Sequence, residues 1–340
     1  MSRIGPQRRQ RGAALLLALL IMTLVATLAA GMVWLQWRGI EVETAERARA
    51  QADWLLNASL DWGNLILKSS IRNGDPDDDL GQPWATPLEE TKLSSFLSAD
   101  GTHSEDSGPE AYLSGQITDA QSKYNLYNLV IATDSAGKKT EIQRLQILLT
   151  AIGVSPDVAE TIASGMRISY TAQQNLVSQP GQADSTGSVL MPIELSDLAW
   201  YGIDPKVIKQ LEPFVQIIPF TGTTAMTINA NTAPAEVLMV GCPVLTRAQA
   251  EQIILQRRQS PFQDPAKVTA NVGIPVASGC GSTTPGAPGG ILAIKSQYFE
   301  IFGQLRYEQH VIRERSVVYR KDQFTPVQVL RRERLPPDAT

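Results

Sequence analysis

The stretch of sequence that decides the fold lies at residues 13–35 and reads AALLLALLIMTLVATLAAGMVWL. It contains no charged side chain, and at ~1.5 Å per residue it is about 34 Å long as a helix, enough to cross the apolar core of a bilayer. Four arginines precede it, and Arg38 stands almost alone after it. The sequence therefore predicts one transmembrane helix over residues 13–37, with a cytoplasmic N-terminus and a periplasmic body.

Three interpretations of this N-terminal segment are compatible with its pattern. A secretory signal peptide would be cut after the apolar run, near the small residues 27–30, whereas a signal anchor would not be cut at all. In a prepilin the cut falls before the apolar run, directly after a glycine, and the helix stays on the mature protein. The basic leader at residues 1–12 ends in RRQRG, so Gly12 and Ala13 would flank that cut.

The transmembrane helix is expected to continue beyond the membrane. The segment from residue 39 to residue 71 lacks proline, has the single internal glycine Gly63, and repeats apolar residues mostly at steps of three or four. Asn73 and Gly74 then form a helix stop signal. We therefore expect residues 38–72 to form the periplasmic part of a long spine helix of the kind that pilin-type subunits use to assemble.

Four short strands are expected in the body. Residues 111–118 and 123–131 have the composition of strands, and residues 297–307 and 311–320 alternate with period two, as an antiparallel hairpin does. The tail over residues 326–340 contains RRER and a Pro-Pro pair and is expected to be flexible.

Helical patterns fill the sequence between the two pairs of strands. The predicted fold is therefore α+β: a small pilin-like α/β domain over residues 73–138 and 292–325, with a large all-α domain inserted over residues 139–291. Residues 171–190 are expected to be a linker inside this insert.

Charge and motif content exclude several functions. Residues 1–40 hold five arginines and no acid, so the other 300 residues carry 25 basic and 34 acidic side chains, a net charge of −9. An acidic body repels nucleic acid. The chain contains no GxSxG, P-loop, HExxH or CxxC motif, and its two histidines, His103 and His310, fall in predicted loops. The sequence therefore predicts neither an enzyme nor a nucleic-acid-binding protein.

Residues 229–268 resemble helix–hairpin–helix modules, many of which bind DNA. Asn231 and the residues after it fit the first helix of such a module, and Phe262 fits the aromatic residue that docks after the second. The glycine pair of the hairpin is replaced by Gly241-Cys242-Pro243-Val244, in which Pro243 lacks the backbone N–H that would contact phosphate. We expect a scaffold of this type that is used for protein contacts.

The chain has two cysteines, Cys242 and Cys280. On the periplasmic side of a membrane a disulfide is the default, and a loop of this length stabilises by about 3–4 kcal/mol in the chain-entropy model. The alternative is two unpaired thiols.

The loop after the spine helix is acidic, with Asp75, Asp77, Asp78 and Asp79 close together. A solvated acidic turn explains the cluster without any ligand. Calcium binding is the alternative, because hard cations take clustered carboxylate oxygens, but the spacing of an EF-hand is absent.

Taken in order, several segments resemble the K-type minor pseudopilins of type II secretion systems. They are RQRG before AALLL, ITDAQSKYNLYNL at 117–129, the helical region from Leu195 to Pro219, NANTAPAEVL at 229–238, and SQYFEIFGQLRYEQHVIRERSVVYRK at 296–321.

The residue at mature position five supports this resemblance. Most pilins and pseudopilins carry Glu there, which neutralises the N-terminal amine of the subunit already assembled ahead. Counting from Ala13, this position is Leu17, and K-type subunits characteristically lack the Glu. A subunit at the tip has no neighbour ahead, and an unpaired charge in lipid is costly.

The resemblance implies that prepilin peptidase cuts after Gly12 and that N-methylation of Ala13 stays open. It implies a place in the inner membrane, assembly with I- and J-type minor pseudopilins, other pseudopilins and the assembly platform, and contact with secreted substrates at the tip. No cofactor is expected apart from calcium, which has a place in this family. The competing interpretation is a signal-anchored periplasmic binding or adaptor module that does not enter a filament.

Overall fold

The computed structural model describes residues 11–72, 74–92, 111–132, 135–178, 190–220, 225–275, 280, 290–307, 310–322 and 324–336. The chain divides into two compact units, Met1–Ala58 and Ser59–Thr340, which are treated separately below.

A single helix, α1 (Arg11–Arg72), begins in the first unit and ends in the second. Its apolar segment is the one helix among the described residues that is long and apolar enough to cross a membrane. Proline is absent from it, which lets the backbone hydrogen bonds run on without a break. The helix predicted to extend to residue 72 is confirmed, whereas leader residues 1–10 lie outside the described residues.

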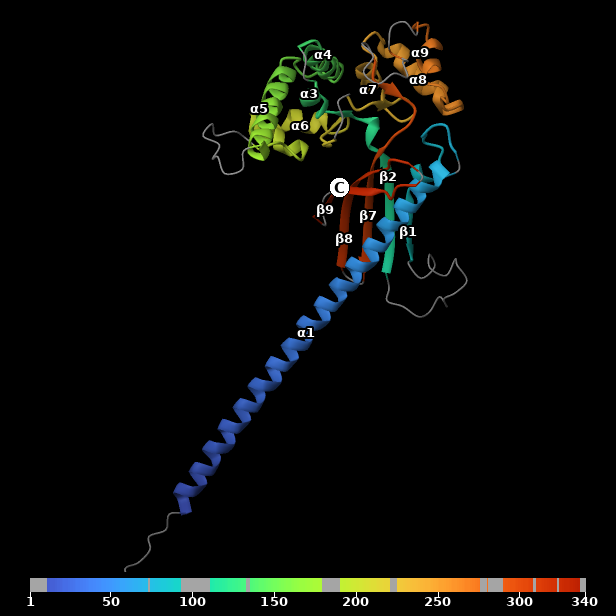
Figure 1. Ribbon diagram of the computed structural model, residues 1–340. Coiled ribbons are helices and arrows are strands. Elements are labelled where there is room, and N and C mark those ends of the chain that lie inside the picture. Colours follow the sequence, from blue (N-terminus) through green and yellow to red (C-terminus); the bar gives the residue numbers. More distant parts are fainter. Residues whose placement is uncertain are drawn as a thin grey trace, which may run out of the picture. The chain divides into compact units, whose positions relative to one another are not determined.

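The second unit is built on a five-stranded antiparallel sheet with the order β1-β2-β7-β8-β9 (Figure 1). Its strands are β1 (Leu88–Lys92), β2 (Ala111–Asp119), β7 (Tyr298–Tyr307), β8 (His310–Tyr319) and β9 (Gln328–Leu335). Side chains of β7 alternate strictly between buried and half-buried, as the period-two pattern predicts. Leu60 and Leu67 of α1 pack on this sheet with Trp84, Phe299 and Val318.

Three predictions about this sheet were wrong. Residues 328–335 of the predicted flexible tail form strand β9, which pairs with β8. Leu88–Lys92 forms an edge strand where a loop was expected. His310 begins β8 opposite Tyr307 instead of lying in a turn.

The helical block starts earlier than predicted. Residues 123–131 are not a strand: after the two-residue strand β3 (Tyr124–Asn125) the chain forms helix α3 (Asn128–Ile131). The reason is long-range. The side-chain amide of Asn125 makes reciprocal hydrogen bonds with the backbone of Ile218, with N···O distances of 2.8 and 3.0 Å, which ends the strand locally. The core of the block accordingly begins at Tyr124 and not at residue 139.

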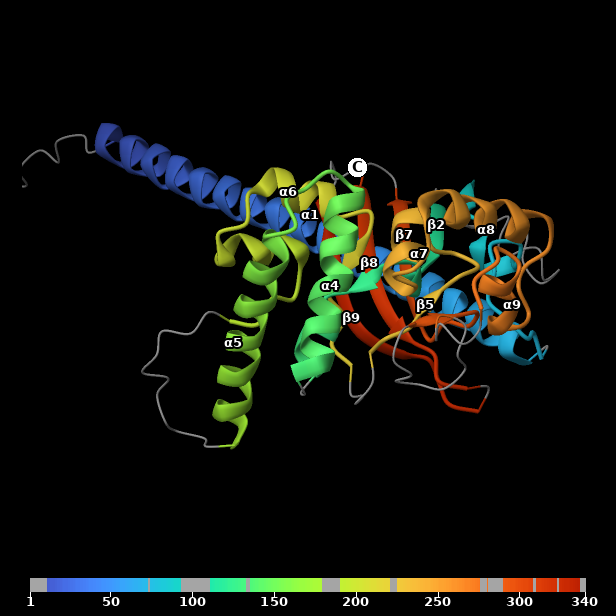
Figure 2. The same ribbon diagram turned by 90° about the horizontal axis from the view of Figure 1, so that it is seen from above.

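The block contains two groups of helices that lie at one end of the sheet (Figures 1 and 2). The first group is α3, α4 (Ser135–Ala151), α5 (Val158–Ser178), the 3-10 helix η3 (Leu195–Tyr201) and α6 (Pro205–Leu211). The second is α7 (Ala235–Gly241), α8 (Arg247–Gln259) and α9 (Pro265–Ala270). Helix α5 runs through residues 171–178, where a linker was predicted; residues 179–189 lie outside the described residues.

The block also contains two short pairs of parallel strands. Strand β3 pairs with β4 (Val215–Gln216), and β5 (Ile228–Asn229) pairs with β6 (Leu292–Ala293). Helix starts follow the local sequence, since Asp204 and Asp264 accept hydrogen bonds from the first turns of α6 and α9, each of which has proline at its start. The α+β fold predicted from the sequence is confirmed in class, with an extra strand at each edge of the sheet.

Candidate functional site

The predicted processing site lies at the start of α1. Gly12 and Ala13 are helical, and Leu17 is 64% exposed on the bare apolar segment. Such exposure of an apolar helix is what a lipid environment would cover. Cleavage after Gly12 and the role of Leu17 stay predictions.

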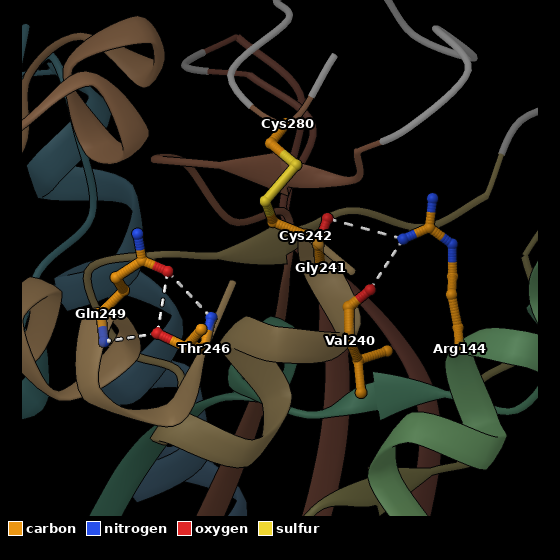
Figure 3. Close-up of a disulfide and its surroundings, with 7 residues drawn as sticks. All are labelled: Arg144, Val240, Gly241, Cys242, Thr246, Gln249 and Cys280. Carbon is orange, nitrogen blue, oxygen red and sulfur yellow. Dashed lines mark hydrogen bonds between the residues drawn. A yellow bond between two sulfur atoms is a disulfide. The ribbon is translucent and has the colours of Figure 1, made fainter. Parts of the chain in front are cut away.

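In the second helix group, Cys242 and Cys280 form a buried disulfide with an S–S distance of 2.11 Å (Figure 3). Cys242 directly follows α7 and opens the hairpin that leads to α8. The disulfide therefore attaches Cys280 to this hairpin.

Two further features fix the hairpin. Arg144 of α4 donates from Nη1 to the carbonyl oxygens of Val240 and Gly241, at 2.7 and 3.5 Å, so a cation satisfies the C-terminal carbonyls of α7 (Figure 3). A Cβ on Gly241 would lie 2.3 Å from Cδ2 of Leu292, so only glycine permits this approach of α7 to β6. The hairpin is thus held by the Arg144 hydrogen bonds and by close packing on β6, and its use for protein contacts stays a prediction.

Asn231 connects the helix–hairpin–helix segment to the loop after α1. Its amide makes reciprocal hydrogen bonds with the backbone of Phe262, both at 2.9 Å. It also donates to Oδ2 of Asp77 at 3.1 Å. The sequence predicted that Phe262 docks on this helix–hairpin–helix segment. It did not predict that the side chain of Asn231 holds the backbone of Phe262.

A buried polar cluster, which we call the junction, joins the helical block to the sheet. At its centre Asp119, the last residue of β2, accepts hydrogen bonds at Oδ2 from Ser296 Oγ (2.7 Å), Thr232 Oγ1 (2.6 Å) and Asn229 Nδ2 (2.9 Å). Burial raises the pKa of Asp119 to about 6, although these hydrogen bonds favour its ionised form. One carboxylate thus links β2, the start of the helix–hairpin–helix segment and the return to β7.

The junction also contains a buried ion pair, Arg320 with Asp78. Arg320 Nη2 lies 2.6 Å from Asp78 Oδ1, and both side chains are almost fully buried, at 2% and 5% exposure. The guanidinium also donates to the carbonyl oxygen of Leu67 (2.9 Å) and to Ser70 Oγ (2.7 Å) near the end of α1. Arg320 therefore fixes α1, the acidic loop and the sheet to one another within the second unit.

The acidic loop is used in this network. Asp78 pairs with Arg320, Asp77 accepts from Asn231, and Asp79 accepts from the backbone N–H of Gly81. Burial, with the nearby Asp79, Asp78 and Asp75, raises the pKa of Asp77 to about 6. Among the residues that the structure describes, no three His, Cys, Asp or Glu side chains are grouped so as to hold a metal ion. Calcium binding by Asp75, Asp77, Asp78 and Asp79 stays a prediction.

Sequence analysis missed the centre of the junction. Asp119, Asn229, Ser296 and Arg320 are separated by up to about 200 residues, and no spacing rule connects them. The available signal was local: Asp119 is the last residue of β2 and Arg320 directly follows β8, so each charged residue lies where a strand ends.

A long helix with an apolar first half, whose last turns pack on an antiparallel sheet, is the arrangement that the sequence predicted for a pilin-type subunit, here enlarged by an inserted helical block. The family described as type II secretion system protein K matches this block in two parts, residues 122–220 and 228–282, which coincide with its two helix groups. Over these two segments the chain is therefore similar to type II secretion system protein K.

Similarity to relatives of the same name extends over most of the chain. Type II secretion system protein K of Pectobacterium carotovorum subsp. carotovorum is 28% identical over 345 residues, covering 96% of both chains. The protein of the same name from Pseudomonas aeruginosa is 23% identical, covering 88% of this chain and 85% of the relative. The crystal structure of the GspK-GspI-GspJ complex from enterotoxigenic Escherichia coli contains a chain with the same fold, at a TM-score of 0.57 and 17% identity, covering 86% of this chain and 98% of that one.

Proposed function

We propose that this chain occupies the tip of the type II secretion pseudopilus, where it initiates or caps assembly for protein export across the outer membrane. The observation that carries the proposal is the place of the helical block. The block adjoins the C-terminal end of α1, where Asn231 bonds to Asp77 and Asn229 bonds to the carbonyl oxygen of Asp78. This is the end of the helix opposite, in sequence, to the apolar segment, so the block would obstruct a subunit stacked above it.

The side chain at mature position five supports the same role. Leu17 offers no carboxylate to the amine of a subunit ahead, and a tip subunit has no such neighbour. Leu17→Glu would place an unpaired carboxylate in the bilayer, at a cost of a few kcal/mol. The variant should still be processed and should gain nothing in assembly, whereas in a subunit of the filament body the same change should improve incorporation.

The decisive measurement is the position of the wild-type protein in the filament. Gold labelling of the native chain on sheared pseudopili should mark one end only. Labels distributed evenly along the filament would refute the tip, whatever the position-five variant does.

Processing and orientation belong to the same proposal. We infer that prepilin peptidase removes residues 1–12, leaving a single-pass inner-membrane protein with a cytoplasmic N-terminus and a periplasmic body. Gly12→Val should leave the full-length chain in the membrane, and N-terminal sequencing of the wild type should begin at Ala13. A mature protein that begins near Gly31 would indicate a secretory signal peptide, and an uncut chain would favour the signal-anchored adaptor.

The partners that suit this role are the I- and J-type minor pseudopilins, because the E. coli structure of the same fold is a complex with proteins of those names. Other pseudopilins, the assembly platform and secreted substrates are further proposed partners. Calcium at the acidic loop is tested by thermal unfolding: added calcium should raise Tm relative to EGTA, and equal values would refute the site. No catalytic or nucleic-acid-binding role is proposed.

A further inference from the structure

An apolar hollow of the second unit lies between the first helix group and the end of the sheet. It has a volume of about 690 Å³ and is lined on one side by α5, residues 190–193 and η3, and on the other by β8 and β9. We call it the β9 groove. Volumes of 300–1,000 Å³ are typical of sites that bind ligands or peptide side chains.

The rim of the β9 groove exposes large apolar side chains. Leu190 is 73% exposed, Ile193 58% and Trp200 48%, and Leu330 of β9 faces the same hollow. Isolated exposed hydrophobic residues are normal, but several around one groove mark an interaction site. The junction and the disulfide, which hold the block together, do not involve these residues.

The charged side chain that lines the groove indicates which kind of occupant would fit. Of the described residues that line the β9 groove, Arg331 is the only one with a charged side chain. Its Nη1 donates to the carbonyl oxygen of Ile193 and its Nε lies 3.8 Å from Oε2 of Glu333, but a guanidinium has five N–H donors, more than these two contacts use. An apolar occupant with one acidic group therefore fits the site better than a neutral or basic one.

The edge strand beside the groove favours a polypeptide over a lipid as the occupant. Among the strands that the structure describes, β9 is the last of its sheet and has β8 as its one neighbour. Backbone groups on the outer side of an edge strand can pair with an incoming extended segment, while pockets beside the strand take alternate side chains. A lipid acyl chain would use the apolar walls but not this edge.

We propose that the β9 groove binds an extended segment of another protein, with alternating apolar side chains and an acidic residue placed against Arg331. The residues of this groove are not those on which the proposed function rests, which are Leu17 and the pairs Asn231–Asp77 and Asn229–Asp78. Its test uses the isolated full-length chain and does not depend on filament assembly.

The test measures peptide binding to the full-length chain in nanodiscs by fluorescence anisotropy. The probe is a blocked, labelled nonapeptide of alternating valine and threonine with one central glutamate; the matched probe has lysine instead. The wild type should bind the glutamate peptide about fivefold more tightly, the size expected of one partly exposed ion pair. Arg331→Glu should reverse this preference.

Leu190→Asp keeps the test valid if Arg331→Glu disturbs folding, because Leu190 is largely exposed. It should weaken binding of the glutamate peptide by about tenfold or more, since it places a charge in the apolar wall. Val244→Asp is the matched control: Val244 is 57% exposed on the α7–α8 hairpin, away from the groove, and should bind like the wild type.

Three outcomes would overturn the proposal. They are the absence of measurable peptide binding, equal loss of binding in Leu190→Asp and Val244→Asp, and an unchanged preference in a folded Arg331→Glu variant. Saturable binding of decanoate that is lost in Leu190→Asp, without peptide binding, would identify a lipid as the occupant.

Discussion

Removal of Arg320 should be among the most damaging single changes to the second unit. In Arg320→Met the side chain of Asp78 loses its ion pair while it remains 5% exposed. Leaving one partner of a buried ion pair uncompensated costs about 3–5 kcal/mol. For a unit of this size, 1 kcal/mol corresponds to about 2–4 °C, so Tm should fall by about 10 °C.

A double-mutant cycle on the full-length protein in one detergent tests this reasoning. The thermal unfolding of each variant is monitored by near-UV circular dichroism. Asp78→Asn should also destabilise, because it leaves the guanidinium without its carboxylate. The double variant Asp78→Asn/Arg320→Met should lose less than the sum of the two single losses, since its second change removes a charge that is already unpaired.

Arg247→Met provides the matched control. Arg247 also pairs with carboxylates, Glu236 and Glu251, but its side chain is 57% exposed. Surface pairs of this kind contribute little, so Tm should hardly change. Additive losses within about 0.5 kcal/mol in the cycle, or equal losses at Arg247 and Arg320, would refute the claim that the buried pair holds the junction.

Other predictions test separate parts of the structure. Gly241→Ala should destabilise by about 1–3 kcal/mol through overlap with Leu292, whereas Gly39→Ala, at a position with open space around it, should not; equal effects would contradict the packing argument. Cys280→Ser should cost about 3–4 kcal/mol and abolish the linked peptide in non-reducing peptide maps, while free thiols in rapidly alkylated wild type would disprove the bridge. Asp119, with a pKa raised from 3.8 to about 6, holds its proton more strongly in the folded than in the unfolded chain. The stability of the wild type relative to Asp119→Asn should therefore fall by about 2–3 kcal/mol as pH rises from 4 to 7, and a constant difference would contradict this pKa.

The sequence was most informative where hydrophobic periodicity and local helix-stop residues decide the structure. The apolar run, the absence of proline to residue 72 and the Asn73-Gly74 stop predicted α1. The alternation in residues 297–307 predicted β7. Both elements bury or expose their side chains according to their own sequence, so local patterns suffice.

Strand β9 shows where such patterns fail. Its segment QVLRRERL has no clear apolar alternation, and its side chains are mostly exposed or half-buried. It is held by the ladder to β8 and by cross-strand ion pairs such as Arg332 with Glu314, 2.8 Å apart. Those partners are visible only once the sheet is formed.

Three asparagines account for much of the remaining difference. Asn125, Asn128 and Asn231 each use both ends of the side-chain amide to pair with the backbone of a distant residue, as a short strand would. In the sequence they indicate turns or helix caps. The junction was missed for the same reason, because most of the side chains that bond to Asp119 and Asp78 lie more than 100 residues away in the chain.

The pairing of Asp119 with Phe299 has a consequence for how such subunits can vary. The chain leaves the sheet at the end of β2 and returns to it at the start of β7. These two strands are adjacent and antiparallel, and their paired Cα atoms lie about 5 Å apart. Any insert whose ends meet at that spacing can be grafted there without changing strand register. Inserted domains of very different size and surface can therefore evolve at this one position, while the sheet and α1 stay unchanged.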